Sequence, residues 1–182
     1  MNKVRLTFRG VSEIVGTEEI GLVVLVDETL SRQLTIPCDK QMLSQFRMRI
    51  GKAPVVGRML PEVLWQVIST QTDLHFEILI NDLIDGQYRA MLYNVDTLDP
   101  ISLRASDAVL LAYISGIPLY VERGLMMKQS VEFYEKAKGL SIPVNTISDE
   151  MLQSALDKAI KDENYEMASH LRDEINRRKA KS

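Results

Sequence analysis

The 182-residue chain has few of the residues that build common metal sites and disulfide scaffolds. It holds one cysteine, Cys38, which excludes a disulfide framework and favours a reducing compartment. Because His75 and His170 are the only histidines, a histidine-rich metal site cannot form within one chain. No Cys-x-x-Cys pair, glycine-rich phosphate loop or His-Glu-x-x-His motif is present either. The sequence therefore excludes the sites that depend on these motifs.

Long hydrophobic runs are also missing. The longest nearly apolar stretches, residues 22–26 and 109–114, are far shorter than the roughly 20 residues that a membrane-spanning helix needs. The first residues lead directly into an alternating segment, with no apolar region typical of a signal peptide. We therefore expect a cytoplasmic protein that does not engage a membrane.

Charge of one sign is not in excess. The chain has 22 Lys and Arg against 25 Asp and Glu, a net charge of -3. This balance excludes a globally basic nucleic-acid binder, although it leaves room for a local basic patch. With 46% apolar and 26% charged residues, the composition is typical of a globular protein that buries a core. At roughly 150 residues per domain, the length predicts one domain followed by a short extra segment.

The main segment, residues 1 to 138, begins with strand patterns. Apolar and polar residues alternate over 4–8, a β-branched apolar run covers 21–26, and a returning run covers 33–36. We expect three strands here, with Pro37 ending the third.

Helical spacing follows these strands. Apolar residues recur at helical intervals over 39–50, and a second helix is expected to begin at Pro61, because proline suits the first helical position. The apolar residues of this second helix would share one face: Val63, Leu64, Val67 and Ile68.

The same order of patterns returns in the second half of the main segment. Strand-like alternation covers 74–80, 88–93 and 101–103, and a helix capped by Ser106 is expected to end before Gly116. We therefore expect an α+β domain, with two halves of similar plan.

A constant shift in residue number superposes the two halves. It places Leu25 on Leu92 and Leu34 on Ile101, so that both halves become three strands followed by two helices. This predicts an internally duplicated β-β-β-α-α domain with a mixed sheet. Coincidental periodicity is the alternative, because the two halves share almost no identical residues.

The rest of the chain differs in composition from the main segment. Residues 139–148 carry no charge and contain Gly139 and Pro143, which predicts a linker. Residues 149–182 contain no glycine or proline, and they predict an α-helical hairpin that turns at Asp162-Glu163-Asn164. Each helix is near the marginal length of about 12 to 15 residues, so the two need each other for stability.

The core of this tail is Tyr165-Glu166-x-Ala168 followed by Leu171-Arg172-Asp173-x-Ile175. It resembles the UVR motif, the helical hairpin of the excision-repair proteins UvrB and UvrC. The resemblance implies docking onto another hairpin or another protein, with Tyr165, Leu171 and Arg172 as partner-binding residues. From the residues alone, Tyr165 and Leu171 are expected to close the apolar seam between the helices, and Arg172 to pair with acidic neighbours. The alternative is a generic hairpin packed on its own main domain.

The second half of the main segment carries another set of motifs. Arg104-Ala105-Ser106-Asp107-Ala108 precedes Gly116-Ile117-Pro118-Leu119-Tyr120-Val121, and Asp85-Gly86-Gln87-Tyr88 lies upstream. Together they resemble the bifunctional nuclease domain family over roughly residues 15 to 130. Members of this family are proposed to cut both DNA and RNA, and the domain is often followed by a UVR motif. The resemblance implies a nuclease with little sequence preference.

The chain departs from the family pattern at two places. Pro37-Cys38-Asp39-Lys40-Gln41 lacks the usual Gly and Glu, and Leu60-Pro61-Glu62-Val63 has lost a His and has Glu62 in place of Asp. Hydrolysis of a phosphodiester needs an activated water and charge stabilisation, commonly from metal ions held by carboxylates. These losses favour a weakened or inactive enzyme.

The resemblance implies a set of candidate site residues. Asp107 and Glu62 would be catalytic, and Asp107 would also hold Mg²⁺ or Mn²⁺. Arg104 and Ser106 would bind nucleic-acid phosphate, because a helix N-terminus beside an arginine suits an anion. From the residues themselves, Arg58 belongs to a basic cluster that could contact the nucleic-acid backbone, and a solvated helix face and loop is the alternative. Ser106 and Asp107 also fit a plain role as helix cap and first-turn acid.

Two functional hypotheses follow from these motifs. The first is a metal-dependent nuclease that acts on DNA and RNA. The second is a non-catalytic regulatory protein whose hairpin binds a repair or proteolysis partner. For either function we expect a homo-oligomer, since an open mixed sheet leaves strand edges that another chain can cover.

Overall fold

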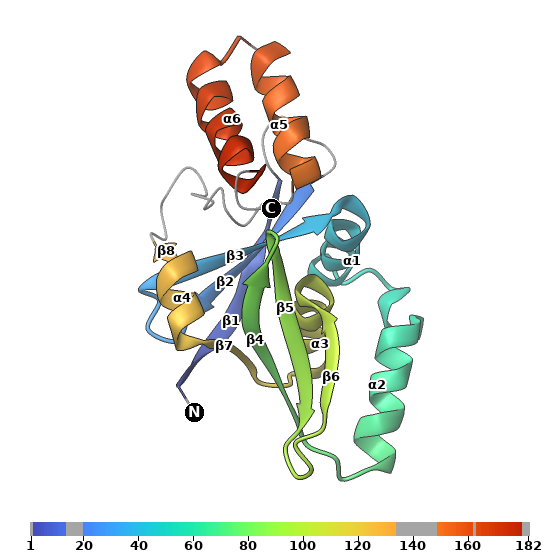
Figure 1. Cartoon of the computed structure of the whole chain (residues 1–182). Coiled ribbons are helices and arrows are strands. Elements are labelled where there is room, and N and C mark those ends of the chain that lie inside the picture. The colour runs from blue at the N-terminus through green and yellow to red at the C-terminus, as the bar shows by residue number, and fades with distance from the viewer. Residues whose placement is uncertain (1, 14–19, 134–148, 162, 180–182) are drawn as a thin grey trace.

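The computed structural model describes residues 2–13, 20–133, 149–161 and 163–179 of the chain. These residues form one sheet with helices on both of its faces, and a pair of helices at the C-terminal end (Figure 1). The predicted linker, residues 139–148, lies outside the described residues. Among the described helices, none is long and apolar enough to span a membrane.

The sheet contains eight described strands. They are β1 (Lys3–Glu13), β2 (Ile20–Asp27), β3 (Arg32–Asp39), β4 (Phe76–Ile84), β5 (Gln87–Asn94), β6 (Pro100–Arg104), β7 (Leu119–Glu122) and β8 (Val131–Glu132). Their order across the sheet is β6-β5-β4-β7-β1-β2-β3-β8. Only β4 and β7 run parallel among these pairs, and the other neighbours are antiparallel, so the predicted mixed sheet is confirmed.

The strand patterns of the first half correspond to β1, β2 and β3, but the third strand does not end where we predicted. Pro37 lies inside β3 and stands opposite Leu22 of β2. On its other side β3 meets the short β8 only at Arg32 and Gln33. Among the described residues this stretch of β3 is paired on one side only, and proline is tolerated on edge strands, so the strand continues through Pro37.

The second half does not follow the predicted order of three strands and two helices. After β6 comes a helix, α3 (Ala105–Ser115), and then β7 re-enters the sheet before the next helix, α4 (Arg123–Gln129). Gly116 ends α3 in the left-handed conformation with φ 74°, which turns the chain back towards the sheet. Four residues of strand are too short to give a clear alternation, so the sequence pattern missed β7.

The ladders of the two halves nevertheless share a register. Leu25 pairs with Leu34 between β2 and β3, and Leu92 pairs with Ile101 between β5 and β6. These are the positions that the constant sequence shift superposes. The internal duplication itself stays a prediction.

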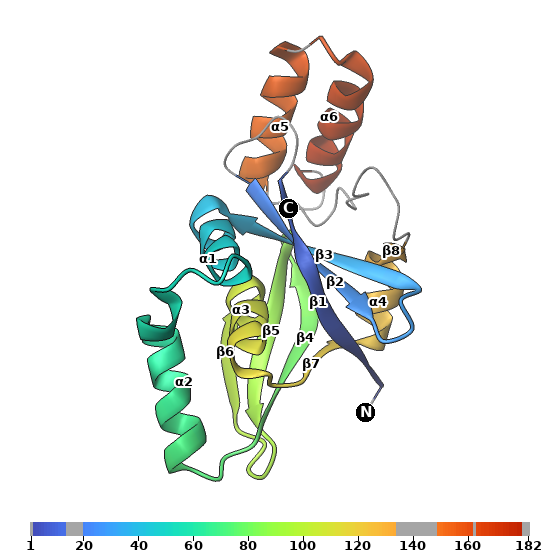
Figure 2. The ribbon, with the colours of Figure 1, turned by 180° about the vertical axis from the view of Figure 1, so that it is seen from behind.

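Three helical segments precede β4 in the chain: α1 (Lys40–Ile50), the short 3₁₀ helix η1 (Val56–Arg58) and α2 (Leu60–Gln71). Helices α1 and α3 cover one face of the sheet, in front in Figure 2, and α4 lies on the opposite face, in front in Figure 1. The main core forms between the first face and its helices, where Phe46 of α1, Val109 of α3 and Leu25 of β2 are fully buried.

The last two described helices, α5 (Asp149–Lys161) and α6 (Tyr165–Lys179), have a hydrophobic core of their own. Its buried members are Leu152, Ala159, Ala168, Leu171 and Ile175. Tyr165 is 68% exposed at the start of α6, so the prediction that it closes the seam between these helices is wrong. Glu174 pairs with Arg177 and Arg178, whereas Arg172 is exposed.

Candidate functional site

The N-terminal ends of α1 and α3 bring three charged side chains together. β3 ends at Asp39 and leads directly into α1, and β6 ends at Arg104 and leads directly into α3. Nε of Arg104 donates to Oδ2 of Asp107 at 2.5 Å, and its Nη2 donates to Oδ1 at 3.2 Å. Nη1 of Arg104 lies 3.5 Å from Oδ2 of Asp39. We call Asp39, Arg104 and Asp107 the charged cluster.

The charged cluster faces solvent. The side chain of Arg104 is 67% exposed, that of Asp39 52% and that of Asp107 37%. The hydrogen bond and negative charge of Asp107, followed by the charge of Asp39, raise the pKa of the Arg104 guanidinium above its usual value. Arg104 therefore stays a cation at any physiological pH, at a helix end that already favours anions.

Asp39 also serves the helix that it precedes. Its Oδ1 accepts a hydrogen bond of 2.7 Å from the backbone N–H of Met42, so Asp39 is the N-cap of α1. Its other oxygen, Oδ2, is the one that lies near Arg104. Asp39 was missed as a site residue by sequence reasoning, because nothing local in the sequence shows that α1 and α3 begin side by side.

Ser106 does not cap α3, contrary to the prediction. The N-cap residue is Arg104, whose extended backbone precedes the first helical residue, Ala105. The strand runs into the helix without a turn between them, so Ser106 falls within the first turn and is 8% exposed. The Ser106 hydroxyl is therefore less accessible to solvent than the side chains of Arg104 and Asp107.

Glu62, the other candidate catalytic residue, is joined to a buried arginine. Its two carboxylate oxygens accept hydrogen bonds from Arg49, at 2.7 Å from Nε and 3.0 Å from Nη2. The Arg49 side chain is 2% exposed, and its Nη1 also donates to the backbone oxygen of Gln45 at 2.9 Å. Glu62 thus ties α2 to α1, and among the described residues it makes no ion pair with the charged cluster.

Arg49 could have been recognised in the sequence as a buried residue. It follows Met42 and Phe46 at helical spacing, on the face that α1 packs into the core. Arg58, the third predicted phosphate ligand, is exposed on η1, just before α2.

The candidate metal ligand Asp107 has too few companions to form a metal site. Within the described ranges, no group of three His, Cys, Asp or Glu side chains is placed to hold an ion. The two carboxylates of the charged cluster both lie against Arg104, whose positive charge opposes a cation there. These residues do not fit a site for Mg²⁺ or Mn²⁺, and we derive no step through such an ion.

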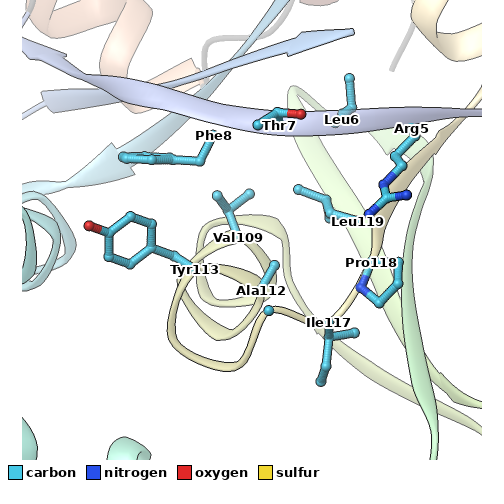
Figure 3. Close-up of a pocket in the computed structure, with 11 residues that line it drawn as sticks. Arg5, Leu6, Thr7, Phe8, Val109, Ala112, Tyr113, Ile117, Pro118 and Leu119 are labelled. Carbon is cyan, nitrogen blue, oxygen red and sulfur yellow. The ribbon is translucent and has the colours of Figure 1, made fainter. Parts of the chain in front are cut away.

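A separate pocket of about 300 Å³ lies between β1, β7 and the C-terminal half of α3 (Figure 3). Most of the side chains that line it are apolar, Phe8, Val109 and Leu119 among them, and Arg5 is the charged one. The Phe8 ring stands edge-on to that of Tyr113, with centroids 4.9 Å apart. The pocket shares α3 with the charged cluster but contains none of its residues.

A comparison with protein families matches the segment that forms most of the sheet. The family model of the bifunctional nuclease domain matches residues 23–134, more than half of the chain. A comparison with curated proteins finds no match. The matched segment includes the charged cluster and ends before α5, so the UVR resemblance of the tail stays a prediction. On this match, the chain belongs to the bifunctional nuclease domain family.

Proposed function

We propose that this protein is a nuclease that cleaves phosphodiester bonds of DNA and RNA with little sequence preference. The family supports a nuclease-like function. At the level of residues, the proposal rests on the exposed Arg104 guanidinium, which lies beside Asp107 and Asp39 at the N-terminal end of α3.

In the proposed reaction Arg104 and the first N–H groups of α3 bind the phosphate. An arginine presents two parallel N–H groups to phosphate oxygens, and it balances the charge that develops on them. Asp107 takes a proton from a water molecule, whose oxygen attacks phosphorus as the bond from phosphorus to the sugar oxygen breaks. The departing oxygen is protonated by solvent.

The lack of sequence preference follows from the same contacts. Arg104 and the helix N–H groups would contact phosphate oxygens, which are identical at every nucleotide and carry no base information. DNA and RNA share this phosphodiester, so the proposed site has no means of rejecting either.

An activity assay with matched variants tests this proposal. The full chain is incubated with single-stranded DNA and RNA, in Mg²⁺, in Mn²⁺ and in a chelator. Because Asp107 is the proposed proton acceptor, we expect Asp107→Asn to lower the cleavage rate on the order of 100-fold or more. The control is Asp85→Asn, which changes an exposed carboxylate in a turn.

Three results decide the proposal. Cleavage by the wild type and the control, but not by Asp107→Asn, supports it. No cleavage above background by the wild type, or equal cleavage by Asp107→Asn, overturns it. Loss of wild-type cleavage in the chelator would show that the reaction needs a metal ion, and it would overturn the metal-free step proposed for Asp107.

A second candidate function is the docking of a protein partner on α6. Tyr165 and Arg172 are both exposed, and their separation of seven residues places them on one face of the helix. Leu171 is 4% exposed and supports the helix pair from inside, so it would act on a partner only through α6. Tyrosine and arginine are among the residue types that dominate binding energy at interfaces.

Binding to an isolated UVR hairpin of a repair protein tests this second function. We expect the full chain to bind it and Arg172→Glu to weaken binding about tenfold or more. Lys161→Glu, the same charge change at the exposed end of α5, is the control. Equal binding by the two variants would contradict docking of the partner on α6.

A further inference from the structure

The segment that leads away from the charged cluster is basic, although the chain as a whole is acidic. Residues 40–61 contain five lysines and arginines and no aspartate or glutamate, whereas the net charge of the chain is -3. The five are Lys40, Arg47, Arg49, Lys52 and Arg58. A local concentration of positive charge on one stretch of surface is typical of a site that binds a polyanion.

Folding separates one of these five residues from the other four. Arg49 is buried, and its charge is paired with that of Glu62. The other four side chains are exposed. Within the described ranges the side chains of Lys40, Lys52 and Arg58 form no ion pair, so their charges can attract a ligand. We call the four exposed residues the basic strip: Lys40, Arg47, Lys52 and Arg58.

The basic strip begins at the charged cluster and follows α1. Lys40 comes directly after Asp39, which caps α1 and lies 3.5 Å from Arg104. Lys40 and Arg47 are seven residues apart, which places them on one side of the helix and about 10 Å apart along its axis. Ser44 is exposed on the same side between them, so its hydroxyl is a further hydrogen-bond donor.

The strip then leaves the axis of α1. Lys52 has a φ of 52° just beyond the helix, and its backbone N–H donates to the oxygen of Arg49 at 3.0 Å. The chain turns there and continues into η1, on which Arg58 is exposed. A nucleic-acid duplex is stiff over such a short distance, whereas a single strand can follow a surface that changes direction. The course of the strip therefore suits a single strand.

We propose that the basic strip binds the phosphates of single-stranded DNA or RNA and leads the strand to Arg104. This inference rests on the proposed function and concerns the part of the substrate next to the phosphate that is cleaved. Lysine and arginine bind phosphate oxygens at any sequence. Phe46, the single aromatic residue of 40–61, is fully buried, so the strip offers no ring on which a base could stack. DNA and RNA should therefore bind alike.

Fluorescence anisotropy of a labelled oligothymidylate measures this binding. The full chain carries Asp107→Asn throughout, so that the strand is not cut during the measurement. We expect Lys40→Gln/Lys52→Gln to raise the dissociation constant about tenfold, and to reduce the slope of its logarithm against the logarithm of salt concentration by about 1.4, the value for two phosphate contacts. The control, Lys128→Gln/Lys161→Gln, removes the same charge from exposed lysines of α4 and α5 and should change neither quantity.

The order of residues along the strip predicts a dependence on strand length. Lys40 lies next to the charged cluster and Arg58 is the farthest member of the strip in the chain. We expect Lys40→Gln to weaken the binding of short and long oligothymidylates alike, and Arg58→Gln to weaken only that of strands long enough to reach η1. Equal effects of the two variants at every strand length would overturn this path.

Other outcomes decide the remaining parts of the proposal. Equal loss of binding in the control variant, or equally tight binding of a polyglutamate of the same length, shows only a general attraction between charges and overturns the site. Tighter binding of a duplex of the same length overturns the assignment to a single strand. Because binding is measured without cleavage, its loss in Lys40→Gln/Lys52→Gln supports the strip even if the wild type cleaves nothing. Cleavage by the wild type, with unchanged binding in that variant, overturns the strip and leaves the proposed nuclease function standing.

Discussion

Two arginines that look alike in the sequence, Arg49 and Arg104, lie in opposite surroundings. The side chain of Arg49 is 2% exposed and that of Arg104 is 67% exposed, although each pairs with a carboxylate through two nitrogens. A buried ion pair stabilises its surroundings only while both partners are present, whereas an exposed pair leaves its arginine accessible to another anion. Burial of its partner favours a structural role for Glu62, and our proposal therefore places the proton transfer on Asp107.

The first prediction concerns the buried pair. Glu62→Ala leaves Arg49 buried without its main partner, and we expect it to lower the free energy of unfolding by about 3 kcal/mol. Urea denaturation followed by circular dichroism measures this change. The control is Glu28→Ala, because Glu28 lies 3.7 Å from Arg5 at the surface, and such a pair contributes about 0–1 kcal/mol. Equal losses in the two variants would contradict a structural role for Glu62.

A second prediction concerns the single cysteine. Cys38 is 4% exposed, and burial, followed by the negative charge of Asp39, raises the pKa of its thiol to about 12. The thiol is therefore protonated at pH 8 and unreactive, since the thiolate is the nucleophile. We expect no labelling by a thiol reagent at pH 8 in the native protein and complete labelling in urea. Rapid labelling of the native protein would show that the thiol is accessible.

The charged cluster shows which contacts between residues can be predicted from the sequence and which cannot. Arg104 and Asp107 are three residues apart at a helix start, so their contact could be predicted from spacing alone. Asp39 joins them only because α1 and α3, which follow two strands far apart in the sheet, begin close to each other. No local sequence pattern shows that these two helix ends lie close together. The predicted site therefore lacked the Asp39 carboxylate.

At the scale of elements, long periodic segments were predictable and short ones were not. The buried run of β2 and the apolar spacing of α1 identified both correctly. The four residues of β7 carry no such signal, and they were missed. The apolar spacing of α2 predicted the helix, but not that its apolar face would stay exposed. A period shows which residues share a face, and only the packing shows what covers that face.

The element-scale prediction concerns the end of α3. Gly116 has φ 74°, and nothing lies within 4 Å of the place that a Cβ would occupy. An added methyl group would therefore meet no steric clash with other residues, and Gly116→Ala would destabilise the protein only because alanine disfavours a positive φ. We expect the free energy of unfolding to fall by about 1 kcal/mol. Gly57→Ala is the control, because its surroundings are equally open and it lacks the positive φ. Similar stability of the two variants in urea denaturation would show that the left-handed cap contributes little.

At the scale of the whole molecule, one strand joins the two halves of the sheet. β1 pairs with β7 on one side and with β2 on the other, so the first described strand of the chain lies in the interior of the sheet. Leu6 of β1 belongs to the main core and is 4% exposed. The family match begins at residue 23 and does not include β1. The structure nevertheless makes this strand part of the same folding unit.

Unlike β1, the helices α5 and α6 contribute no buried residue to the main core. Their buried residues form a separate cluster, and Leu152 within it is 0% exposed without belonging to the main core. The main core therefore keeps its members when this helix pair is removed. Loss of β1 would instead expose the backbone edges of both β2 and β7, and each unpaired N–H or C=O group that stays buried costs free energy.

Two deletions test this difference. We expect the chain without residues 149–182 to stay folded, with a cooperative urea transition close to that of the full chain, because the sheet and its core are unchanged. The chain without residues 2–13 is expected to be unfolded or insoluble, since the sheet loses the strand that joins its halves. Circular dichroism and urea denaturation measure both. Premature unfolding on loss of residues 149–182 would show that α5 and α6 support the main core, and a cooperative fold without residues 2–13 would show that the sheet forms without β1.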